Sequence, residues 1–282
     1  MTLFVVGALH WDVVVRAPRL PHLDETLRGS SVAYQFGGKG GNQAIAAALA
    51  GADVAFAGRI GADDAGKAMR NRLIDAGVDV TGLQVGSGAS GMSAAIVDAD
   101  GNYGAVIVSA ENQQFDPHST AVPRDCGLVL LQNEMAHDAF VETAQKARAA
   151  GVPVAFNAAP AKGLHSADLE LIDTLIVNRV EAADLLGWTN TELDPKDAIT
   201  GLKTLAPGAD IIMTLGEDGV GFAARNGAVA FQRAIDVDVQ STHGAGDVFV
   251  GTYAAEILHG RAMFAAIEAA QEAAAVHISQ IR

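Results

Sequence analysis

The sequence predicts an α/β fold with a mostly parallel central β-sheet and a small second β-sheet, and three observations support this fold class. Short runs of β-branched and apolar residues alternate with helix-like stretches, which is typical of βαβ units whose helices cover both faces of a parallel sheet. The chain has 282 residues, half of them hydrophobic, which is enough to bury one large core. Two segments in the N-terminal part carry strand-like pieces without a helix between them.

Six short runs have the composition of strands that are buried on both faces of a sheet. They are Leu3–Leu9, Asp53–Ile60, Gly127–Leu131, Pro153–Asn157, Thr174–Val177 and Asp210–Leu215. Several of the predicted helices end at glycine, which suits a helix C-terminus. The predicted helices are Gly41–Gly51, Ala65–Gly77, Ala136–Gly151, Val180–Gly187, Lys196–Ala206, Val248–Leu258 and Ala262–Ile278.

The segments Val13–Tyr34 and Met92–Val108 interrupt this alternation. Each has strand-like pieces separated by Gly, Asp or Asn turns, and neither contains a helix-like stretch. We expect them to form a small β-sheet flap that projects from one edge of a single domain spanning residues 1–282.

Charge and composition exclude several classes of partner. The chain has 19 Lys and Arg against 33 Asp and Glu, a formal net charge of -14. Nucleic acids and anionic membranes both need a basic face, so we expect neither as a partner. Cys126 is the one cysteine, which excludes an internal disulfide and favours a reducing compartment. The N-terminus lacks the basic region of a signal peptide and no apolar run reaches about 20 residues, so we expect a soluble, cytoplasmic protein.

The segment Ser241–Phe249 is the most informative part of the sequence. Its Gly244-Ala245-Gly246 turn leads directly into a helical run. Small residues let backbone N–H groups approach a ligand, and a helix N-terminus adds partial positive charge, so the turn can cradle a phosphate or the charge of phosphoryl transfer. Asp247 follows at once and could take a proton from an attacking hydroxyl. The alternative is a tight turn followed by a carboxylate that complements the helix dipole. No Lys-Ser/Thr pair follows, so this is not a Walker loop.

A second glycine-rich segment, Phe36–Ala44, opens the first long helix. Four of the five residues from Gly37 to Gly41 are glycine, which favours a close approach of the backbone to another group. Lys39 offers a cation with three donors, and Asn42 offers both a donor and an acceptor. This composition fits a polyol held by hydrogen bonds, whereas the alternative is a flexible loop before a helix.

Together these segments resemble the two signatures of the ribokinase-like (PfkB-type) carbohydrate kinase family. Four further pieces resemble the family in the same order along the chain. They are Gly7–Asp12, Asn157-Ala158-Ala159-Pro160, Asn178-Arg179-Val180-Glu181 and Thr214-Leu215-Gly216-Glu217-Asp218-Gly219. The resemblance spans nearly the whole chain and implies a three-layer sandwich with a β-sheet lid.

The resemblance also implies a role for particular residues. Asp247 would be the catalytic base, and Gly244, Ala245 and Gly246 would form the anion hole. The sugar contacts would come from His10, Asp12, Gly38, Lys39, Asn42, Glu134 and Asp247. ATP would lie against Asn178, Thr214, Gly216, Gly219, Gly246 and Gln271, and Mg²⁺ near Glu181 and Asn178. In this family, lids often pair between subunits, so a homodimer through a lid face of Val13, Val15, Tyr34 and Phe36 is expected.

Three departures from the family pattern bear on specificity. Ser241 stands where the family usually has an aspartate that helps to shape a monovalent-cation site, and the chain stops at Arg282 without a glycine-rich tail. Both differences count against activation by K⁺. Ribose-specific members carry Asn where this chain has His10, a bulkier side chain that can titrate. His243 lies beside the anion hole, where a packing role is the simpler expectation.

Other functions stay open on the sequence alone. The pentose substrate could be replaced by a nucleoside, such as pseudouridine or a purine nucleoside, or by a keto-sugar acid. A non-catalytic sugar or nucleotide sensor is a further alternative, which the retained Asp247 disfavours. A dinucleotide-binding oxidoreductase is disfavoured because Gly7-Ala8-Leu9-His10 lacks the Gly-x-Gly-x-x-Gly fingerprint.

Overall fold

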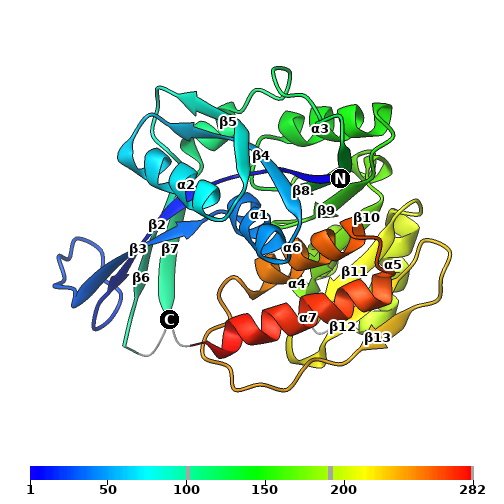
Figure 1. Cartoon of the computed structure of the whole chain (residues 1–282). Helices are drawn as coiled ribbons and strands as arrows, with labels where there is room; N and C mark the ends of the chain where they lie inside the picture. Colours follow the sequence, from blue (N-terminus) through cyan, green and yellow to red (C-terminus); the bar gives the residue numbers. More distant parts are fainter. Residues whose placement is uncertain (100–101, 190–192, 281–282) are drawn as a thin grey trace.

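A nine-stranded sheet forms the centre of the computed structural model, which describes residues 1–99, 102–189 and 193–280 (Figure 1). The strand order is β13-β12-β11-β10-β9-β8-β1-β4-β5, and all strands from β11 to β5 pair in parallel. These are β1 (Thr2–Val6), β4 (Asp53–Gly61), β5 (Asp79–Gly86), β8 (Cys126–Gln132), β9 (Val154–Asn157), β10 (Thr174–Asn178) and β11 (Asp210–Thr214). The last two strands, β12 (Val220–Ala223) and β13 (Ala230–Gln232), pair antiparallel, and β13 lies at the edge.

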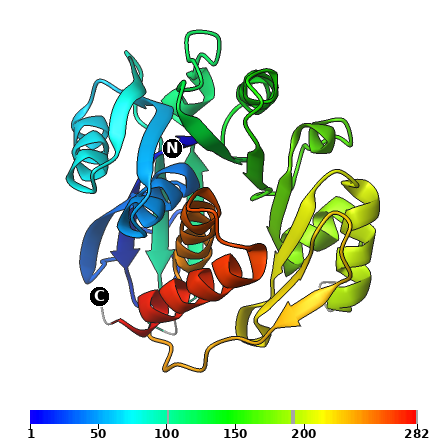
Figure 2. The same ribbon diagram turned by 45° about the vertical axis from the view of Figure 1, so that its right-hand side comes forward.

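Two sets of helices cover the two faces of this sheet (Figures 1 and 2). They are α1 (Lys39–Leu49), α2 (Asp64–Asp75), α6 (Ala245–Leu258) and α7 (Met263–Ser279) on one face, and α3 (His137–Ala149), α4 (Arg179–Leu186) and α5 (Pro195–Leu205) on the other. Successive residues of a strand point to opposite faces. Leu3 and Val5 accordingly pack with the first set of helices, and Phe4 and Val6 pack with the second. The structure is therefore a three-layer sandwich.

A separate four-stranded sheet, called the lid below, projects from one side of the sandwich (Figure 1). It consists of β2 (His10–Arg16), β3 (Ser31–Gly37), β6 (Met92–Val97) and β7 (Tyr103–Val108), in the order β3-β2-β6-β7. The predicted α/β fold with a small second sheet is thus confirmed. The expected flap segments supply most of the four lid strands, but β2 begins three residues earlier, at His10, and β3 ends three residues later, at Gly37.

The structure corrects several predicted boundaries. The first strand ends at Val6 instead of Leu9, because the chain turns at Gly7, where a Cβ would lie 2.7 Å from the Gly40 backbone. Strands β5, β12 and β13 were not predicted. Helix α1 begins at Lys39 and α6 at Ala245, two and three residues earlier than expected. Both helices therefore start inside the glycine-rich segments that preceded them in the prediction. In the described residues, no helix has the length and apolar character needed to cross a bilayer.

Candidate active site

The two glycine-rich segments lie side by side at the N-termini of α1 and α6. These helices pack so closely that a Cβ on Gly251 would lie 2.3 Å from the carbonyl oxygen of Gln43. Asn42 Nδ2 donates to Asp247 Oδ2 at 3.3 Å, and Gln43 Nε2 donates to Asp247 Oδ1 at 2.9 Å. The predicted base therefore faces the segment that was predicted to hold the sugar.

The predicted anion-binding turn lies at the start of α6. Gly244 is the N-cap, and its φ of 77° lies in the left-handed region that favours glycine. A Cβ on Gly246 would meet no atom within 4 Å, so a ligand can approach the backbone there. The backbone N–H of Ala245, in contrast, lies 3.3 Å from the carbonyl oxygen of Thr242. The helix N-terminus and the open side of Gly246 are thus the features best suited to a phosphoryl group.

The end of α7 holds the loop before this turn. The backbone N–H groups of Gln240 and Ser241 donate to the carbonyl of Ile278. His277 Nε2 lies 2.8 Å from the carbonyl oxygen of His243 and must carry the proton, because a carbonyl oxygen only accepts. That carbonyl belongs to the same peptide group as the N–H of Gly244. The bond from His277 therefore polarises a peptide of the anion-binding turn.

Glu134 lies beside Lys39 in the predicted sugar pocket, and two further carboxylates act on it electrostatically. Glu134 Oε2 accepts the backbone N–H of Lys39 at 2.7 Å, and Asp12 Oδ1 accepts the hydroxyl of Ser93 at 2.6 Å. Burial raises the pKa of Glu134 to about 7; the Lys39 N–H and charge oppose this rise, and the charges of Asp247 and Asp12 add to it. The four predicted residues Asp12, Lys39, Glu134 and Asp247 are therefore electrostatic neighbours.

Gly38 shapes the entrance to α1. Its φ is 87°, and a Cβ there would lie 2.5 Å from the carbonyl oxygen of Ala8. No other residue type fits this position, so the conformation that brings Lys39 to Glu134 depends on glycine.

His10 is buried beside this pocket with 4% of its surface exposed. Burial lowers the pKa of its imidazole, and the charge of Asp12 opposes the shift. Its Nε2 makes no hydrogen bond with the described part of the chain. A buried polar atom without a partner is costly, which makes this nitrogen a candidate contact for a bound ligand.

The two predicted metal residues form the start of α4. The Asn178 side chain accepts the backbone N–H of Glu181 at 2.9 Å, and Glu181 Oε2 accepts the backbone N–H of Asn178 at 2.8 Å, a capping box. Burial raises the pKa of Glu181, whose carboxylate also senses Lys39 and Asp247. Among the described residues no group of three His, Cys, Asp or Glu side chains could hold a metal. The half-buried Glu181 carboxylate fits Mg²⁺, which keeps several waters and is often bound through one or two carboxylates.

The predicted nucleotide turn follows β11. Thr214 Oγ1 is within 3.4 Å of the Val177 carbonyl, and Gly216 and Gly219 both have positive φ. An ion pair between Arg179 and Asp218 (2.6 Å) joins this turn to the start of α4. Gln271 lies on α7, and its Nε2 donates to the Arg233 carbonyl at 2.8 Å. Its amide nitrogen is thus engaged by the loop after β13.

A chain of buried amides that was not predicted lies behind Asp247. Gln132, Gln43 and Asn157 are all buried, and they connect the ends of β8 and β9 to α1. Gln43 directly precedes the small and apolar run from Ala44 to Leu49 of the same helix. A polar residue on the buried face of such a helix was the available signal for its role.

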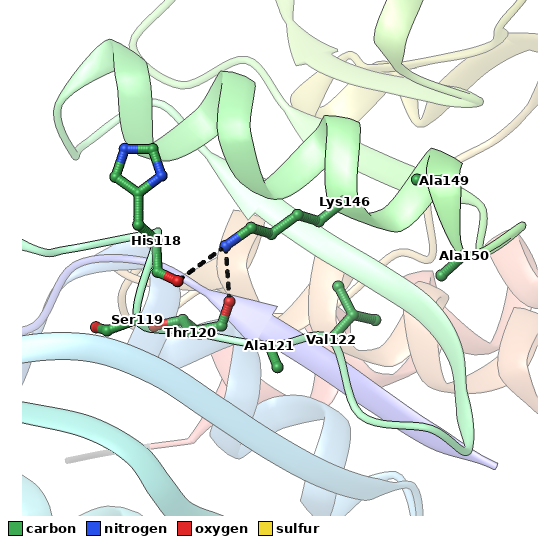
Figure 3. Close-up of a pocket in the computed structure, with 8 residues that line it drawn as sticks. All are labelled: His118, Ser119, Thr120, Ala121, Val122, Lys146, Ala149 and Ala150. Atoms are coloured by element: carbon green, nitrogen blue, oxygen red, sulfur yellow. Dashed lines mark hydrogen bonds between the residues drawn. The ribbon is translucent and has the colours of Figure 1, made fainter.

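Figure 3 shows a surface pocket elsewhere, between α3 and the segment from His118 to Val122. Lys146 Nζ donates to the backbone carbonyls of Pro117 (2.5 Å), Thr120 (3.0 Å) and His118 (3.4 Å). All three ammonium donors are thereby used within the protein. The segment precedes β8, at the opposite end of the sheet from the strand ends that carry Gln132 and Glu134, so this pocket is not part of the candidate site.

Comparison with known proteins identifies the family of this chain. A family model described as pfkB family carbohydrate kinase matches residues 2–281. The chain is 32% identical to a ribokinase of Haemophilus influenzae, with 99% of this chain and 92% of that protein covered. It is 30% identical to a ribokinase of Bacillus subtilis, with 97% and 92% covered.

Solved structures show the same fold. The chain superposes on an Arabidopsis thaliana ribokinase complexed with ribose and ATP with a TM-score of 0.89 and 27% identity, covering 99% of this chain and 93% of that one. A Cryptococcus neoformans ribokinase in complex with ADP gives a TM-score of 0.83 and 27% identity, with 99% and 94% covered. The resemblance noted from the sequence is confirmed. The chain therefore belongs to the pfkB family of carbohydrate kinases, and it is a sugar kinase.

Proposed function

We propose that the protein transfers the γ-phosphoryl group of ATP to the hydroxymethyl group of a pentose, most specifically ribose. One observation carries this proposal: Asn42 and Gln43, from the segment suited to a polyol, both donate to Asp247 at the start of the anion-binding helix. The ribokinase relatives, one of them solved with ribose and ATP, support ribose as the acceptor.

In this mechanism Asp247 accepts the proton of the hydroxymethyl group as its oxygen attacks the γ-phosphorus. The bond between that phosphorus and the β–γ bridging oxygen breaks, and ADP leaves. The N-terminus of α6 and the backbone at Gly244 and Gly246 stabilise the charge on the transferring group, which is the main demand of phosphoryl transfer. Thr214, Gly216 and Gly219 form the turn against the nucleotide. Glu181 and Asn178 are the residues that would hold Mg²⁺, which would supply neutralisation of the phosphate charge.

The charge of the pocket favours a neutral acceptor. Asp12, Glu134 and Asp247 are electrostatically coupled, and Lys39 is the cation among them. A keto-sugar acid would bring a fourth carboxylate into this group, at an electrostatic cost. A nucleoside remains the second candidate, because the unpartnered Nε2 of His10 could bind a donor or acceptor that ribose lacks.

We also propose that two copies pair through the lid. The strand register puts Val13, Val15, Tyr34 and Phe36 on one lid face, together with Val106 and Val108. Tyr34, Val106 and Val108 are exposed. An exposed apolar face of this kind marks an interaction site. Sedimentation at micromolar concentration would give a dimer for the wild type and a monomer for Val106→Lys; a wild-type monomer would refute this pairing.

Two further proposals concern the conditions under which the enzyme works. We propose that residues 1–282 act as one cytoplasmic kinase domain, consistent with a single free cysteine and a strongly acidic surface. We also propose that turnover does not need K⁺. Ser241 is neutral, and its hydroxyl lies 3.3 Å from the N–H of His243; Arg282 lies outside the described residues. Equal rates in potassium and tetramethylammonium salts would support this, and a strict requirement for K⁺ would refute it.

A substrate panel tests the proposed function. Release of ADP is measured with Mg-ATP and ribose, 2-deoxyribose, hexoses, purine nucleosides, pseudouridine and a keto-sugar acid. We expect the highest kcat/KM with ribose and no turnover when Mg²⁺ is chelated. Preference for a nucleoside would replace ribose by the second candidate. Binding of sugars without any turnover would instead support a sensor.

A further inference from the structure

Gln43 is the central member of the buried amide chain behind Asp247. It is 0% exposed, although glutamine is usually a surface residue. Its Nε2 donates to Asp247 Oδ1 and to Asn157 Oδ1, both at 2.9 Å, and its Oε1 accepts from Gln132 Nε2 at 2.8 Å. Both amide hydrogens and one oxygen lone pair are therefore used.

The orientation of this chain is fixed by its ends. Asn157 Nδ2 donates to the carbonyl of Ile176 at 3.1 Å, so Asn157 Oδ1 must face Gln43 as an acceptor. Gln43 must then present its nitrogen to Asn157, and the same nitrogen reaches Asp247. An ionised carboxylate only accepts hydrogen bonds. The opposite orientation of the Gln43 amide would therefore place its Oε1 against two acceptor oxygens, Asn157 Oδ1 and Asp247 Oδ1.

The chain also ties Asp247 to the rigid part of the fold. Gln132 ends β8, Asn157 ends β9 and Ile176 belongs to β10, so three adjacent strands anchor Gln43. The bond to Gln43 occupies Oδ1, at 2.9 Å, whereas Oδ2 has the longer 3.3 Å contact with Asn42. Oδ2 is therefore the oxygen with the weaker protein partner.

We propose that Gln43 is a positioning residue, which holds the Asp247 carboxylate through Oδ1 so that Oδ2 faces the acceptor hydroxyl. This inference rests on the proposed function, because it requires Asp247 to be the base. The gain is pre-organisation: a carboxylate that rotates away from the hydroxyl must be reoriented before each transfer. Displacement of a reacting group by about 1 Å can cost about 100-fold in rate.

A double-mutant cycle with Asp247→Asn tests this coupling. Gln43→Met keeps the length of the side chain and removes both donors. We expect kcat to fall about 10- to 100-fold, with the Kd for ribose changed by less than about threefold, because the reacting geometry is altered more than binding. In the Asp247→Asn background the same change should lower the residual rate by less than about twofold, since residues that act as a unit are non-additive.

Two further variants separate positioning from stability. Ile199→Val leaves a small cavity under α5, on the opposite face of the sheet, and should lower Tm without changing kcat. If Gln43→Met does not fold, Gln132→Met takes its place in the cycle. It removes the partner that anchors Gln43, without touching Asp247, and should lower kcat by about 3- to 10-fold.

The outcomes distinguish this inference from the proposed function. Suppose that Asp247→Asn loses turnover. The positioning role alone would then be overturned if Gln43→Met had the kcat of the wild type. It would also be overturned if Gln43→Met lowered the rate by the same factor in the wild type and in Asp247→Asn. Full turnover in Asp247→Asn would overturn the base assignment, and the inference with it. A large kcat loss that disappears in the Asp247→Asn background would support both.

Discussion

Replacing Glu134 by glutamine should stabilise the protein at alkaline pH and weaken its binding of sugar. The pKa of Glu134 is raised from 4.5 to about 7 by burial, so between these pH values the folded protein holds a proton that the unfolded chain releases. The free energy of unfolding therefore falls as pH rises through this range, and the full penalty is present above pH 7. Such a shift corresponds to at most about 3 kcal/mol, since water still reaches this carboxyl.

Urea unfolding of the wild type and Glu134→Gln at pH 5 and pH 8 measures this effect. The variant should gain about 2 to 3 kcal/mol relative to the wild type between the two pH values, because glutamine does not titrate. Contributions of ionisable groups that do not interact with Glu134 are common to both proteins and cancel in the difference. An unchanged difference between pH 5 and pH 8 would refute the account of a buried carboxyl beside Asp12 and Asp247. Calorimetry at pH 8 should show weaker ribose binding by the variant, a trade of function for stability.

Three other substitutions have outcomes fixed by the local geometry. Gly38→Ala should weaken ribose binding more than tenfold in calorimetry, because its Cβ would clash with the Ala8 carbonyl. Gly77→Ala is the matched control: this glycine also has a positive φ, 82°, but open space around it, so the change should cost about 1 kcal/mol of stability and leave binding unchanged. His10→Asn should raise kcat/KM for ribose relative to nucleosides, and an unchanged ratio would exclude His10 from specificity. His277→Leu should lower kcat by about 3- to 10-fold, because the hydrogen bond to the His243 carbonyl is lost. His277→Gln keeps a donor and should retain most activity. Equal effects of the two substitutions on kcat would contradict the role of that hydrogen bond.

The fold could be predicted because its elements have strong local signals. The strands of the parallel sheet are short apolar runs, and the lid segments lack helical periodicity, so both appear in the sequence. The edge strands were harder. Asp79–Gly86 mixes polar and apolar residues and contains two glycines, and Ala230–Gln232 has only three residues. Such strands owe their conformation to pairing with a neighbour and not to their own composition.

Helix starts show a similar limit. Lys39–Gly41 and Ala245–Gly246 contain glycines, which local propensity assigns to loops. In the fold, Gly38 and Gly244 take positive φ and act as N-caps, so the helices begin directly after them. The glycines that lower helix propensity are also the residues that let the backbone approach a ligand or another segment.

Within the candidate site, the sequence pointed to the residues predicted to touch ligands, and it did not reveal the buried amides behind Asp247. Asp247, Asn42 and Glu134 stand in recognisable segments, whereas the partnership of Gln43 with Gln132 and Asn157 joins positions up to 114 residues apart. Only the three-dimensional fold reveals that contact. Gln271 stays a predicted nucleotide contact: its amide nitrogen binds a loop carbonyl, and its buried Oε1 has no hydrogen-bond partner in the described part of the chain.

The most direct measurement is the turnover of Asp247→Asn, with Mg-ATP and ribose, set beside its affinity for ribose. Asparagine preserves the size of the side chain but cannot take the proton of the attacking hydroxyl. We expect kcat to fall by about 1,000-fold or more while the Kd for ribose stays within about fivefold. Turnover close to that of the wild type would contradict the assignment of phosphoryl transfer to the junction of α1 and α6.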